Sequence, residues 1–137
     1  MRPPPSPKTK ALARQVLAFE AAVNEGPAVF HACEKLRLHL GTLAGVAGFR
    51  TLLHRALALA RADNRALNHL VIRPDGSLAW DEELKIEPAQ RQIYEEGTAL
   101  VAQLLALLEI FIGEALMLHL LQDVWPMMDP NQKFEKT

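Results

Sequence analysis

Apolar residues recur every three or four positions along most of this chain, which is the spacing of one buried face of an α-helix. The first stretch begins after Ser6, a good N-cap residue, and Pro7, which is tolerated in a first helical turn. Gly26 is predicted to end this helix, whose apolar face consists of Leu12, Val16, Phe19 and Val23. A second helix is predicted from Pro27 to Gly41, with the apolar face Val29, Cys33, Leu36 and Leu40.

The small residues at 42–48 predict a tight connection to a third helix, which runs from about Phe49 to Asp63. The helical period then stops. Short apolar runs at 70–72 and 78–80 flank the sequence Arg-Pro-Asp-Gly-Ser, in which proline, aspartate and glycine favour a turn. A β-hairpin is therefore predicted, and because two strands alone are only marginally stable it should lean on the helices.

The longest helix is predicted to begin near Pro88, and its apolar pattern changes phase at Gly113. Beyond this glycine the stripe lies on nearly the opposite side of the helical wheel and comprises Leu116, Met117, Leu120, Leu121 and Val124. We expect either a break near Gly113 or a second half that meets a different partner. The sequence Trp125-Pro126 should close the fold, since helices usually end before proline.

These elements predict an all-α bundle of four to five helices with a short β-hairpin at about residues 69–80. The 137 residues, half of them apolar and 23% charged, are enough for one globular domain, expected at 7–126. A disordered proline-rich lead-in is expected at 1–6 and a polar tail at 127–137. The single cysteine excludes an intrachain disulfide framework.

Residues 99–121 are long enough to cross a bilayer, but they contain Gln103, Glu109, Glu114 and His119. A helix buried in a soluble bundle is the better interpretation, and no membrane insertion is expected. The proline-rich start is not followed by an apolar segment of the kind found in secretory signals. A cytoplasmic location is therefore expected.

Three stretches together resemble a group of small, uncharacterised bacterial helical proteins. They are Leu43–Phe49 followed by Leu52–Ala60, then Asp75–Leu78, and then Leu104–Glu114 running on to Trp125-Pro126. The resemblance covers about residues 30–126. It implies a bacterial cytosolic setting, and because the group has no assigned activity it supplies no catalytic residues.

The chain carries few of the residue patterns that support catalysis or cofactor binding. A helical di-metal site needs Glu-x-x-His repeats, whereas only the reversed pair His31 and Glu34 is present, so no metal or other cofactor is predicted. Cys33 falls on an apolar stripe and is expected to be a packed core thiol. The glycines at 41–48 follow a helix and lack a following Lys-Ser/Thr, which excludes a phosphate-binding loop. No catalytic residue is predicted.

Charge is distributed unevenly along the chain. Residues 1–65 hold ten Lys and Arg against four Asp and Glu, whereas residues 66–137 hold five against twelve. The basic third helix could lie near the acidic segment Asp81–Glu96 within the bundle. Alternatively, one stripe of this helix and its extension could face an anionic partner, including nucleic acid, through Arg50, His54, Arg61 and Arg65.

Three functions remain open at this stage. The first is a non-enzymatic interaction or regulatory module, with a homodimer as one form of it, because a surplus apolar face needs a neighbour. Its expected interface is Leu116, Met117, Leu120 and Leu121. The second is a small-molecule-binding or enzymatic bundle with a pocket near Glu109, Glu114 and His119; Glu109 and Glu114 could instead lie at a helix edge or pair with an arginine. The third is a nucleic-acid-binding accessory protein that uses the basic stripe.

Overall fold

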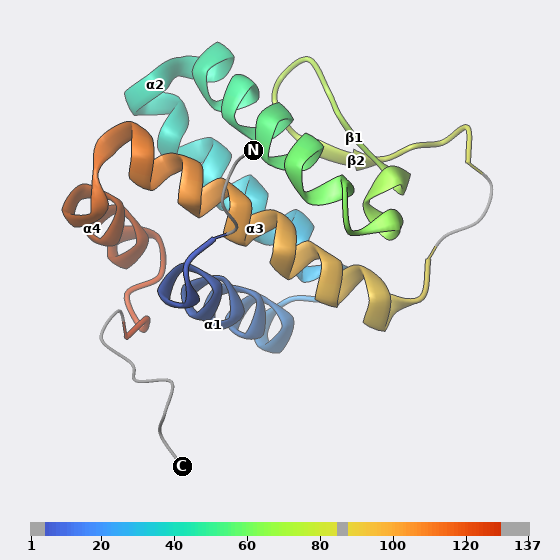
Figure 1. The fold of residues 1–137 in the computed structure, drawn as a ribbon, viewed down its shortest axis with the longest axis horizontal. Coiled ribbons are helices and arrows are strands. Elements are labelled where there is room, and N and C mark those ends of the chain that lie inside the picture. Colours follow the sequence, from blue (N-terminus) through green and yellow to red (C-terminus); the bar gives the residue numbers. More distant parts are fainter. Residues whose placement is uncertain (1–4, 85–87, 130–137) are drawn as a thin grey trace.

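A computed structural model describes residues 5–84 and 88–129 of the chain. Most of the predicted lead-in at 1–6 and most of the predicted tail at 127–137 lie outside the described residues. The described part contains four α-helices and one two-stranded hairpin, which confirms the prediction of an all-α bundle with a small β insertion. Figure 1 shows α3 running through the middle of the molecule, with α1 on one side and α2 on the other.

Helix α1 (Pro7–Val23) begins where the sequence predicts. Its N-cap is Ser6, whose hydroxyl accepts a hydrogen bond of 3.1 Å from the backbone N–H of Thr9. This bond satisfies one of the orphan donors of the first turn, and Pro7 has no N–H that needs a partner. The helix ends at Val23, and Gly26 allows the chain to reverse because its φ of 84° favours glycine.

Helix α2 (Ala28–Arg61) contains both the second and the third predicted helices. They are two arms of one element that bends at Gly45, where φ is 78° and ψ is 166°. The connection between the two arms is therefore shorter than the predicted segment 42–48, because one glycine outside helical geometry is enough to redirect the chain. In Figure 1 this bend lies at the left end of the bundle.

A 3-10 helix, η1 (Arg65–His69), leads into the predicted hairpin, formed by β1 (Leu70–Ile72) and β2 (Leu78–Trp80). The strands pair antiparallel, with Leu70 opposite Trp80 and Ile72 opposite Leu78. In the turn, hydrogen bonds from the hydroxyl and the backbone N–H of Ser77 lower the pKa of the Asp75 carboxyl. The Trp80 ring meets Phe30 of α2 edge to face at 5.1 Å, so the hairpin leans on a helix as predicted.

Helix α3 (Gln90–Ile112) ends at Gly113, whose φ of 88° and ψ of 158° confirm the predicted break, and α4 (Glu114–Val124) follows. Gly97 allows α3 to approach α2 closely, since a β-carbon on Gly97 would lie 2.7 Å from the Val29 Cβ. Helix α4 ends before Trp125, as predicted. Trp125 and Met128 are buried whereas Met127 is 82% exposed, so Met128 is the residue by which the described start of the predicted polar tail packs against the bundle.

A buried carboxylate ties three helices together. Glu20 of α1 has no exposed surface, and its carboxylate accepts hydrogen bonds of 2.7 Å from Asn24 Nδ2 and Trp125 Nε1. The Lys35 ammonium of α2 lies 2.7 Å from the same carboxylate and 5.2 Å from the centre of the Phe19 ring. The end of α4 is therefore fixed to α1 and α2 by a polar contact as well as by apolar packing.

No helix within the described ranges combines the length and the apolar character needed to span a membrane. The leucine-rich segment over 99–121 is divided at Gly113, and its two parts belong to the bundle.

Candidate interaction surface

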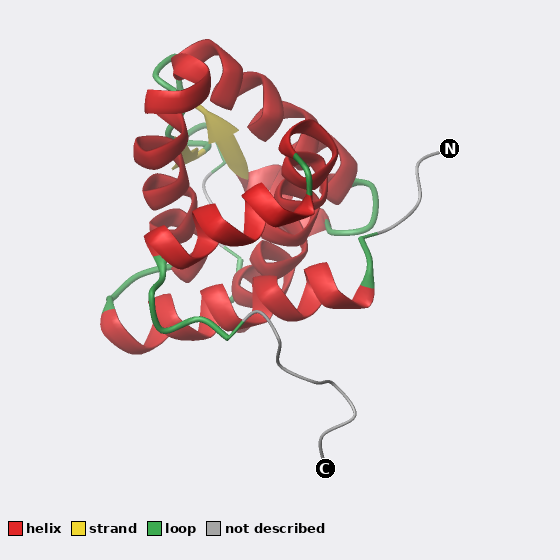
Figure 2. Cartoon of the chain, turned by 90° about the vertical axis from the view of Figure 1, so that its left-hand side faces the viewer, coloured by secondary structure: helices red, strands yellow, loops and turns green. Residues whose placement is uncertain are grey.

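Five large apolar side chains remain exposed at one end of the bundle. Leu43 and Val46 flank the bend of α2, Ile110 and Phe111 belong to the last turn of α3, and Leu116 lies in the first turn of α4. Figure 1 places the α2 bend and the α3–α4 corner at the same left-hand end of the molecule, and Figure 2 views this end. Their exposed fractions run from 49% to 71%. We call this set the open-end patch.

The local sequence explains why these side chains stay exposed. The run from Gly41 to Phe49 carries no charged residue, and Gly45 turns the two arms of α2 away from each other there. At the α3–α4 corner, Gly113 redirects the chain immediately after the last turn of α3. No described element covers the outer side of either turn, since Thr42, Ala47 and Ala115 are also exposed.

The open-end patch reaches the size of the largest apolar patch that a typical monomer exposes. Large apolar side chains carry on the order of 150–200 Å² each, so the five exposed fractions leave roughly 500 Å² of apolar surface. Patches of about 300–600 Å² are the largest that typical monomers expose, and they are often functional. Leu43 and Leu116 also line one surface cavity of about 210 Å³, so the α2 bend and α4 contribute to one continuous surface.

The interface predicted from the sequence needs correction. Met117, Leu120 and Leu121 are at most 4% exposed and belong to the core of their own chain, so they do not form an exposed surface. The reason is that α4 turns back at Gly113 and packs the phase-shifted stripe against the rest of the bundle. Of the predicted interface residues, Leu116 alone is exposed, at 53%, and it belongs to the open-end patch.

The three residues of the predicted pocket, Glu109, Glu114 and His119, have different surroundings. Glu114 makes an exposed ion pair with Lys8 of α1, and His119 lies 3.8 Å from the Asp123 carboxylate. The cavity beside His119 is lined by neither Glu109 nor Glu114. Glu109 lies in α3, before the α3–α4 corner, whereas Glu114 and His119 follow the corner in α4.

Two of the four residues of the predicted basic stripe donate hydrogen bonds within the chain. The Arg50 guanidinium donates to the Pro74 carbonyl at 3.1 Å, and Arg61 donates to the carbonyls of Leu67, at 3.3 Å, and Leu70. These bonds attach the hairpin region to α2. The other two residues of the stripe, His54 and Arg65, are exposed.

The alternative prediction placed this stripe near the acidic segment over 81–96. No ion pair joins the two in residues 5–84 and 88–129, so charge pairing does not hold them together there. Instead, the Glu96 carboxylate accepts a 2.7 Å hydrogen bond from the backbone N–H of Ala66, at the start of η1.

The candidate nucleophile Cys33 and the candidate metal ligands His31 and Glu34 are engaged by their own chain. Cys33 is buried, and burial raises the pKa of its thiol to about 12, as expected for a packed core cysteine. The imidazole of His31 is hydrogen-bonded to the Glu25 carbonyl at 2.7 Å, and Glu34 pairs with Arg37 instead of with His31. In the described part of the chain, no three His, Cys, Asp or Glu side chains form a group that could hold a metal ion.

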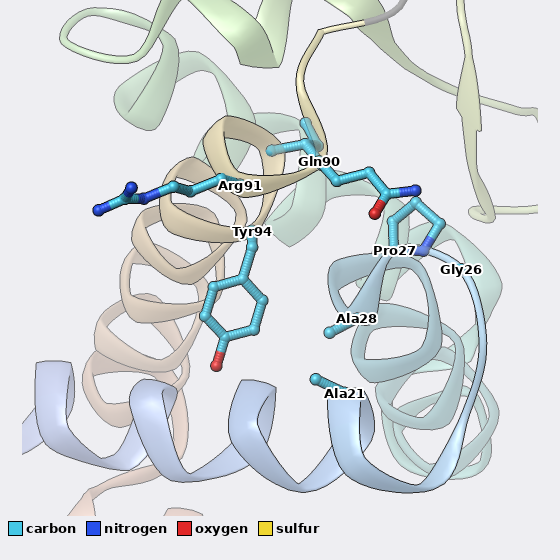
Figure 3. A pocket seen from close by; sticks show the side chains of 8 residues that line it. Ala21, Gly26, Pro27, Ala28, Gln90, Arg91 and Tyr94 are labelled. Atoms are coloured by element: carbon cyan, nitrogen blue, oxygen red, sulfur yellow. The ribbon is translucent and has the colours of Figure 1, made fainter.

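A cavity of about 320 Å³ opens between the α1–α2 turn and the start of α3 (Figure 3). The Tyr94 ring lies across from the small side chains of Ala21 and Ala28, whereas the Arg91 side chain points away from them. Arg91 is paired with Glu95 at 3.3 Å. Among the described residues, no Cys, Ser, His, Asp or Glu lines this cavity, and Tyr94 is the residue there whose side chain ionises as an acid.

Comparison with protein-family models, with curated protein sequences and with solved structures finds no match to this chain. The resemblance to a bacterial helical group therefore stays a prediction.

Proposed function

We propose that this protein is a non-enzymatic interaction module that self-associates through the open-end patch. The observation that carries the proposal is the exposure of five large apolar side chains at one end of the bundle: Leu43, Val46, Ile110, Phe111 and Leu116. In water such a surface gains free energy when another apolar surface covers it.

A second copy of the chain is the occupant that the size of the patch favours. Two patches that meet face to face would bury about 1,000 Å² from these side chains alone, which reaches the lower limit of specific interfaces. A two-fold axis brings the same surface of both copies together, so one patch per chain is sufficient and the assembly closes. The uncharged run from Gly41 to Phe49 also suits the centre of an interface, where charged residues are depleted.

The alternatives predicted from the sequence receive less support. A ligand in the cavity beside His119 would not contact Glu109 or Glu114, since neither lines it. On a nucleic-acid surface, Arg50 and Arg61 would have fewer donors for phosphates, because both already donate to carbonyl oxygens of the same chain. We also propose a bacterial origin, on the basis of the sequence resemblance, and a cytoplasmic location, on the basis of the sequence pattern.

Sedimentation velocity from submicromolar to high micromolar concentration tests the proposal. We expect the sedimentation coefficient to rise from that of a monomer to that of a dimer, with a dissociation constant in the micromolar range or tighter. Phe111→Glu, at a side chain that is 64% exposed, should shift the transition to at least tenfold higher concentration.

Val23→Glu is the matched control. Val23 is 55% exposed at the end of α1, outside the patch, so its substitution introduces the same charge without touching the proposed interface. A monomer at every concentration would contradict the proposal, and so would a dimer that both substitutions weaken equally.

A further inference from the structure

A second surface of the molecule, away from the open-end patch, is a polar cleft of about 310 Å³ where α1, the end of α2 and α3 meet. Its volume is at the lower end of the range for small-molecule sites. Lys10 and Arg14 of α1 form one part of its lining, and acids come from Asp63, in the turn that follows α2, and from Glu95 of α3.

The charged groups of this cleft are not neutralised by one another. Lys10, Arg14 and Asp63 make no ion pair within 4 Å in the described chain, although all three line the same cleft. Glu95 pairs with Arg91, which does not line the cleft. Opposite charges therefore line one cleft without pairing with one another, so a molecule that carries both charges could pair with them there.

The two cations lie close to each other because of their spacing. Lys10 and Arg14 are four residues apart in α1, so they project from the same face of the helix. Two neighbouring cations repel each other and favour an anion between them. Their donors, an ammonium and a planar guanidinium, both suit a carboxylate.

The rest of the lining leaves room and adds neutral polar groups. Ala99 and Ala102 of α3 have short side chains, which keep the space between the charged groups open. The Gln103 amide also lines the cleft and makes no hydrogen bond within the described ranges, so it can donate to or accept from a peptide-like group.

We propose that this cleft binds a small zwitterion of the amino-acid or short-peptide class, with its carboxylate at Lys10 and Arg14 and its ammonium at Asp63 and Glu95. The site is independent of self-association, because none of its residues belongs to the open-end patch.

A titration series of glycine peptides tests both charges of the ligand. Glycine, diglycine and triglycine carry the same two charges at increasing separation, whereas N-acetyltriglycine lacks the ammonium and triglycinamide lacks the carboxylate. We expect the backbone amide resonances of Ala99 and Ala102 to shift saturably with the best-fitting zwitterion, with a dissociation constant on the order of 1 mM. Each capped triglycine should bind about three- to fivefold more weakly than triglycine, as expected for the loss of one exposed ion pair.

Two variants test which residues of the cleft bind each charge of the ligand. In Asp63→Asn, triglycine and N-acetyltriglycine should bind with more similar affinities, because the ammonium has lost an acid. In the Lys10→Gln, Arg14→Gln double variant, triglycine and triglycinamide should bind alike. Arg55→Gln, at an exposed arginine that does not line the cleft, is the control and should leave the series unchanged.

The ligand series on the unmodified protein can overturn the proposal without any variant. Capped and uncapped triglycine that bind equally would show that the charges do not select the ligand. Shifts confined to residues outside the cleft, or no saturable shift with any zwitterion at tens of millimolar, would also overturn it.

Discussion

Replacing Glu20 by alanine should destabilise the protein strongly, even though this residue belongs to neither of the proposed binding surfaces. Its carboxylate has no exposed surface and accepts hydrogen bonds from Asn24 and Trp125 while pairing with Lys35. In the alanine variant the indole N–H of Trp125, which is 2% exposed, has no acceptor. A buried donor without a partner costs about 1–3 kcal/mol, and breaking a buried ion pair costs about 3–5 kcal/mol.

The lower part of that range applies here. The Lys35 side chain is 39% exposed, so its ammonium can return to water when the carboxylate is removed. We expect a loss of about 3 kcal/mol in the free energy of unfolding, which for 137 residues corresponds to a decrease of about 10 °C in Tm. Glu25→Ala removes an exposed acid nearby and should change the stability by less than about 0.5 kcal/mol.

Urea unfolding of Glu20→Ala, Trp125→Phe and the double variant measures the interaction itself. Trp125→Phe keeps an aromatic ring but removes the N–H donor, so the two substitutions should be non-additive by about 1–2 kcal/mol. A Glu20→Ala variant that loses less than about 1 kcal/mol, or a cycle that is additive within error, would refute the role assigned to this carboxylate.

Three further predictions follow from the backbone, the packing and the buried thiol. Gly45→Ala should lower the free energy of unfolding by about 1–3 kcal/mol, because the φ of Gly45 is positive. Gly41→Ala, in helical backbone with open space around it, should be neutral or stabilising. Equal effects of the two substitutions in thermal unfolding would contradict this prediction. Gly97→Ala should destabilise despite its higher helix propensity, since the new methyl group meets Val29, and a gain of stability in urea would disprove the close contact. The pKa of Cys33 is raised to about 12 against an ordinary value of 9.0, so above pH 9 the unfolded chain releases a proton that the folded chain keeps. Stability should therefore fall with rising pH towards 12, by up to about 1.4 kcal/mol per unit, and Cys33→Ala should remove this part of the dependence in urea titrations at pH 8 to 10.

Much of the fold could be predicted from the spacing of apolar residues. The Ser6 cap, the hairpin and the break at Gly113 each depend on local rules that neighbouring residues determine. The burial of Glu20 could not be predicted in the same way, because its donors lie up to 105 positions away in the sequence. Its position four residues after Val16, on the apolar stripe of the first helix, was the available signal.

The candidate surfaces were harder to predict, because helical periodicity identifies an apolar stripe but not what covers it. The stripe containing Met117 and Leu121 was expected to face a neighbour, yet α4 turns at Gly113 and covers it with its own chain. Phe111 follows Leu104 and Leu108 at the spacing of one helix face, and both of these leucines are buried, yet Phe111 is 64% exposed at the last turn. Where a helix ends, the face it presents depends on the path of the next segment.

Hydrogen exchange of the unmodified protein at high and at low concentration tests most directly whether the open-end patch is the site of self-association. If it is, backbone amides over 41–48 and 110–116 should exchange more slowly in the concentrated sample, and amides of α1 should exchange equally in both. Equal exchange over 41–48 and 110–116 at every concentration, or protection that appears only elsewhere, would contradict the account.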